Sequence, residues 1–81
     1  MSNEAELILK AFINETKKDI IDFTNVTPDS LNIRDDIFYR ALKELEGLGY
    51  VTNIAWCDDN GEALYDNIEI NRKDFKLRNL F

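Results

Sequence analysis

Apolar positions recur at helical spacing near the start of the chain. They are Ala5, Ile8, Ala11 and Phe12. Asn3 followed by Glu6 matches a helix N-cap with a reciprocal acid three residues later, so we expect a helix over about residues 4–16. The intervening Leu7, Leu9 and Ile13 make this helix apolar around more than one face. Either a broad core or a partner must cover the additional apolar surface.

The most regular helical repeat begins at Asp35. Its apolar positions are Ile37, Phe38, Ala41, Leu42, Leu45 and Leu48, with charged residues on the other faces. Gly49 follows, and glycine supplies the positive φ with which many helices end. The pattern therefore predicts a long helix that closes at this glycine.

Two shorter elements are expected between the long helices. Asp19–Phe23 mixes charged residues with β-branched and aromatic ones, which predicts a short strand. Thr27 and Pro28 form an N-cap and first-turn pair, which predicts a brief helix through Leu31. Asn32 is suited to ending that helix.

The last third of the chain has the pattern of a β-hairpin. Tyr50–Cys57 is rich in β-branched and aromatic residues, which predicts a strand. Residues 58–61 (Asp-Asp-Asn-Gly) favour a tight turn, and Leu64–Ile70 is expected to form the second, antiparallel strand. Three helices followed by a hairpin is the element order of a winged helix-turn-helix. We therefore predict an α+β fold in one domain spanning residues 1–81, of which 72–81 form a basic, partly apolar tail.

Residues 32–51, NIRDDIFYRALKELEGLGYV, resemble the third-helix segment of the YjcQ family of small winged-helix proteins from bacteria and their prophages. The similarity continues into the hairpin at Asp58-Asp59 and Leu64-Tyr65, and covers about two thirds of the chain. It implies the winged-helix fold. It implies no activity, because the family has no settled biochemical role.

Composition indicates a cytoplasmic protein without a membrane span. The longest apolar runs reach three residues, far below the roughly 20 that cross a bilayer. The beginning of the chain lacks the basic and apolar segments of a secretory signal. Cys57 is the only cysteine, so no internal disulfide forms, which agrees with a reducing compartment.

The residue inventory argues against an enzyme. The chain has no histidine and three glycines, so the commonest general base and a glycine-rich phosphate loop are both missing. Cys57 is followed by Asp58 and Asp59, whose charges suppress thiol reactivity. The oxygens near the turn do not follow the spacing of a calcium loop. We expect no catalytic site, no metal and no cofactor.

The first functional hypothesis is a DNA-binding regulator, encoded by a phage or mobile element. The third helix of a winged helix usually enters the major groove. The residues that could contact DNA are Asn32, Arg34, Tyr39, Arg40 and Lys43. The net charge of −6 argues against this function, and no basic residue lies between Lys43 and Arg72.

The second hypothesis is an acidic module, or DNA mimic, that binds and inhibits a basic, nucleic-acid-binding protein. Its candidate contacts at the hairpin tip are Asp58, Asp59 and Glu62. A third possibility is a structural module without a ligand of its own.

The tail carries the only basic cluster, formed by Arg72, Lys73, Lys76 and Arg78. These charges could simply solubilise the neighbouring apolar residues, or the tail could be a phosphate-contacting arm. Its apolar residues also suggest pairing of two chains, so the tail and the first helix are the candidate homodimer contacts.

Overall fold

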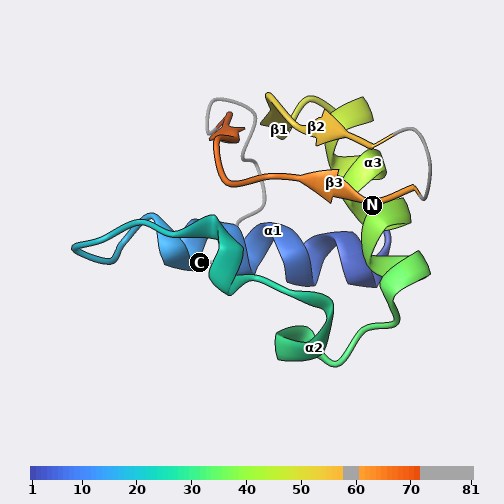
Figure 1. The fold of residues 1–81 in the computed structure, drawn as a ribbon, viewed down its shortest axis with the longest axis horizontal. Helices are drawn as coiled ribbons and strands as arrows, with labels where there is room; N and C mark the ends of the chain where they lie inside the picture. Colours follow the sequence, from blue (N-terminus) through green and yellow to red (C-terminus); the bar gives the residue numbers. More distant parts are fainter. Residues whose placement is uncertain (58–60, 72–81) are drawn as a thin grey trace.

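The computed structural model describes residues 1–57 and 61–71. Its elements in chain order are α1 (Asn3–Glu15), the 3₁₀ helix η1 (Phe23–Asn25), α2 (Pro28–Leu31), α3 (Asp35–Gly47), β1 (Val51–Thr52), β2 (Ala55–Trp56), β3 (Ala63–Leu64) and β4 (Glu69–Ile70). The strands lie on one side of α1 and α2 lies on the other (Figure 1). The architecture is α+β, with three α-helices followed by an antiparallel hairpin, as the sequence predicts.

Helix α1 begins one residue before the predicted start. Ser2 has an extended backbone, and its hydroxyl accepts a hydrogen bond from the Ala5 N–H at 3.1 Å. Asn3 is already helical, so the predicted cap formed by Asn3 and Glu6 is wrong. The core takes up most of the additional apolar surface, because Leu9 and Ile13 are buried.

The predicted strand over Asp19–Phe23 is also wrong. This segment consists of bends leading into η1, where the Asp22 carboxylate accepts a hydrogen bond from the Thr24 N–H at 3.0 Å. The Asp22 side chain thus caps the N-terminus of η1, and the chain turns where a strand was expected. Ile20 is 81% exposed, whereas Phe23 is buried with its ring edge-on to Phe12 at 5.6 Å. One aromatic anchor, rather than strand pairing, holds this connection.

The short second helix and the long third helix are confirmed. Thr27 and Ser30 exchange side-chain-to-backbone hydrogen bonds of 3.0 Å, which cap α2. Asn32 adopts a left-handed conformation with φ 56° and ends that helix. Gly49 has φ +82° just beyond α3, the conformation expected of it.

Each of the two predicted hairpin strands is interrupted, so the hairpin consists of four short strands. β1 pairs with β4 through Val51 and Ile70, and β2 pairs with β3 through Ala55 and Leu64. Between β1 and β2, Asn53 has φ 68°, which breaks the strand geometry. Its side-chain amide donates a hydrogen bond to the Asn67 carbonyl at 2.8 Å. This side-chain bond connects the two halves of the hairpin where strand pairing is interrupted.

The hairpin is attached to the helices through aromatic rings. Tyr65 lies 5.8 Å from both Phe12 of α1 and Phe38 of α3, measured between ring centroids. Its hydroxyl donates to the Val26 carbonyl at 2.6 Å, and burial raises the pKa of Tyr65 to about 12. Because this tyrosine contacts both long helices, it fixes the hairpin relative to α3.

Candidate functional site

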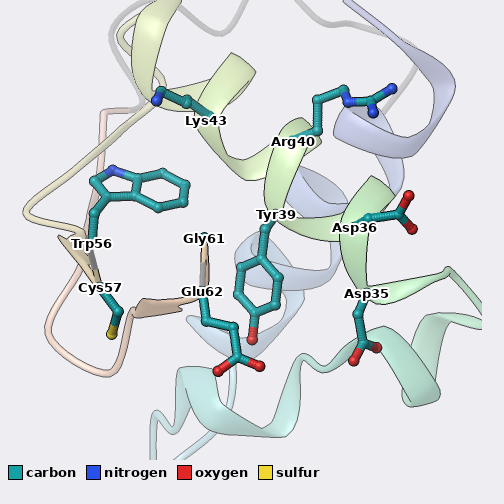
Figure 2. A pocket seen from close by; sticks show the side chains of 9 residues that line it. All are labelled: Asp35, Asp36, Tyr39, Arg40, Lys43, Trp56, Cys57, Gly61 and Glu62. Carbon is teal, nitrogen blue, oxygen red and sulfur yellow. The ribbon is translucent and has the colours of Figure 1, made fainter. Parts of the chain in front are cut away.

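A groove of about 710 Å³ lies between α3 and the hairpin. Its lining residues, shown in Figure 2, are Asp35, Asp36, Tyr39, Arg40, Lys43, Trp56, Cys57, Gly61 and Glu62. Three of the predicted DNA contacts thus share one groove with a predicted acidic contact. The two opposing functional hypotheses concern the same surface.

One end of the groove is formed by Trp56. The Lys43 ammonium lies 5.7 Å from the centre of the indole ring, within range of a cation–π contact. The indole N–H donates to both carboxylate oxygens of Glu46, at 3.0 and 3.2 Å. Lys43 therefore already contacts an aromatic ring within the domain. Sequence reasoning missed Trp56 and Glu46 as site residues, because only the hairpin register places them beside Lys43.

The other end of the groove is anionic. In Figure 2 the carboxylates of Glu62 and Asp35 extend to either side of the Tyr39 hydroxyl. Burial raises the pKa of Tyr39 above its ordinary value, and the negative charges of Glu62 and Asp35 raise it further. The Tyr39 ring also contacts Phe38 edge-on at 5.2 Å, which ties it to the core. This end of the groove favours a positively charged group.

The remaining predicted DNA contacts lie elsewhere. Asn32 and Arg34 line a separate hollow beside α2, together with Pro28. The Arg34 guanidinium pairs with the Asp36 carboxylate at 3.1 Å. Arg40 lines the groove, but its guanidinium points away from Tyr39 in Figure 2. The five predicted contacts therefore do not form one continuous basic surface.

The negative charge of the chain is concentrated in the segment that forms α3 and continues to Asn71. Nine acids and three bases occur from Arg34 to Asn71, so this segment accounts for the entire net charge of −6. We define the acidic face as the exposed surface carrying Asp35, Asp36, Glu62 and Asp66. The first three line the groove, and Asp66 lines a neighbouring hollow that shares Tyr39. The predicted contacts Asp58 and Asp59, and the tail bases Arg72, Lys73, Lys76 and Arg78, lie outside the described residues.

Within residues 1–57 and 61–71, no group of three or more acidic or cysteine side chains converges to hold a metal ion. No helix of that part of the chain has the length and apolar character needed to cross a bilayer. Comparisons with protein-family models, curated proteins and solved structures found no match. The groove and its charge are therefore the features that bear on function.

Proposed function

We propose that this protein is a winged-helix interaction module whose acidic face binds a basic protein segment. The observation that carries the proposal is the exposed acidic face, which belongs to a segment, residues 34–71, in which nine acids oppose three bases. The order of α1, α2, α3 and the hairpin supports the winged-helix assignment. The resemblance of residues 32–51 to the YjcQ family supports it further.

Two of the basic residues near the acidic face make contacts within the domain. Arg34 is paired with Asp36, and Lys43 lies against Trp56. Because these contacts leave the formal charges unchanged, the excess of carboxylates still sets the field at the acidic face, which attracts a basic chain and repels DNA phosphates. A basic segment of a nucleic-acid-binding protein has the chemistry that this surface recognises.

DNA binding is the second candidate function, and Arg40 favours it. This exposed residue lies on α3, the element that usually reads the major groove in winged helices, and it forms no ion pair within the described residues. Tyr39 and Lys43 lie close to it along the same helix. For this function to hold, these side chains must overcome the repulsion from their acidic neighbours.

Titration of the full chain against two fluorescent probes tests the proposal. The probes are a random-sequence DNA duplex and a short peptide of alternating arginine and serine, both at about 50 mM salt. We expect the peptide to bind, its affinity to fall as salt rises, and the duplex to remain unbound. Salt-sensitive binding of the duplex without binding of the peptide would establish the second function instead. Binding of neither probe would leave only a structural module.

A further inference from the structure

We propose that the groove between α3 and the hairpin accepts an arginine side chain of the basic partner. The inference rests on the proposed function and specifies how the acidic face recognises its ligand. The volume of about 710 Å³ lies within the range of roughly 300–1,000 Å³ typical of small-ligand sites. It has room for an extended side chain and part of its backbone.

The aromatic ring at the anionic end of the groove suits a guanidinium group. Trp56 is half-buried and its ring already contacts the Lys43 ammonium, so an arriving guanidinium stacks on Tyr39 and not on this indole. Tyr39 is also half-buried, and its position is fixed by the contact with Phe38. A guanidinium group stacks on such rings more effectively than an ammonium group, because it is planar and weakly hydrated.

The carboxylates supply the second part of the recognition. Asp35 lies at the start of α3 and Glu62 lies in the hairpin, so the two acids approach the groove from different elements (Figure 2). A guanidinium carries five donors in a fixed fork and can bond to acids on two sides. An ammonium is a point charge without this directional match. The arrangement therefore selects arginine over lysine.

The basic side chains of the groove do not block this end. Lys43 lies at the Trp56 end, and the Arg40 guanidinium is directed away from Tyr39 in Figure 2. Glu62 and Asp35, and neither of these cations, flank the Tyr39 hydroxyl at this end in Figure 2. The groove therefore has a basic side chain, Lys43, at its Trp56 end and carboxylates at its Tyr39 end.

Three peptides with identical flanking lysines and a central arginine, lysine or citrulline test the inference with the full chain. Citrulline has nearly the shape of arginine but no charge. Trp56 is the only tryptophan, so its fluorescence reports directly on the groove. We expect the arginine peptide to bind at least about fivefold more tightly than the other two. It should also change the Trp56 emission.

A matched pair of variants separates recognition in the groove from general attraction. Asp35→Asn with Glu62→Gln removes the two groove carboxylates, and Asp19→Asn with Asp29→Asn removes equal charge from exposed positions outside the acidic face. We expect only the first variant to lose the preference for arginine. Equal binding of all three peptides with unchanged emission would overturn the inference and leave the proposed function intact. If no peptide binds, the proposed function itself is wrong.

Discussion

Replacement of Phe38 by alanine should lower the free energy of unfolding by about 3–5 kcal/mol. Phe38 is fully buried on α3, and its ring lies 5.8 Å from Tyr65 of the hairpin. The substitution removes apolar contacts from both sides and leaves a cavity between α3 and the hairpin. Native domains have about 5–15 kcal/mol of stability in total, so this loss approaches the whole for a chain of 81 residues.

Urea denaturation followed by circular dichroism measures this effect. Leu48→Ala is the matched control, because Leu48 follows α3 and is 51% exposed. We expect the control to cost less than about 1 kcal/mol. If Phe38→Ala costs no more than Leu48→Ala, the hairpin is not packed on α3 as described, and the groove between them has no structural basis.

Replacement of both Glu62 and Asp66 by lysine should weaken binding of the arginine–serine peptide by at least about tenfold at low salt. Both acids are exposed and belong to the acidic face, so their reversal changes its charge by four without opening the core. The reversed face should also gain measurable affinity for duplex DNA, because the repulsion of phosphates is removed.

Asp19→Lys with Asp29→Lys provides the control for net charge. These exposed acids lie in the α1–η1 connection and on α2, outside the acidic face. The control has the same formal charge as the test variant and should bind the peptide with nearly unchanged affinity. Equal weakening by both variants would show that the peptide responds to total charge rather than to this face.

The long helices could be predicted from sequence because their signals are local. The repeat through Phe38, Leu42 and Leu45 has one interpretation, and Gly49 marks its end with a conformation that glycine favours. The strand expected at Asp19–Phe23 failed because its capping carboxylate, Asp22, competed with strand geometry. The break at Asn53 was missed although asparagine tolerates positive φ, because its place in the hairpin depends on a bond to the opposing Asn67.

The candidate site was predicted in part. Tyr39, Arg40 and Lys43 belong to one helix, so their proximity follows from the helical repeat. Their association with Glu62 and Trp56 depends on how the hairpin packs against α3, which is a long-range property of the fold. Sequence reasoning therefore identified residues on both sides of the groove without identifying the groove. It also grouped Asn32 and Arg34 with residues from which the fold separates them.

Mapping of backbone amide shifts in the ¹⁵N-labelled 81-residue chain, during addition of the arginine–serine peptide, tests the central claim most directly. We predict that the largest changes lie at Tyr39, Trp56 and Glu62. The amides of Leu7 and Lys10, which line a hollow on the outer surface of α1, should remain unchanged. Changes concentrated on α1, with none along the groove, would contradict the assignment of the acidic face as the binding surface.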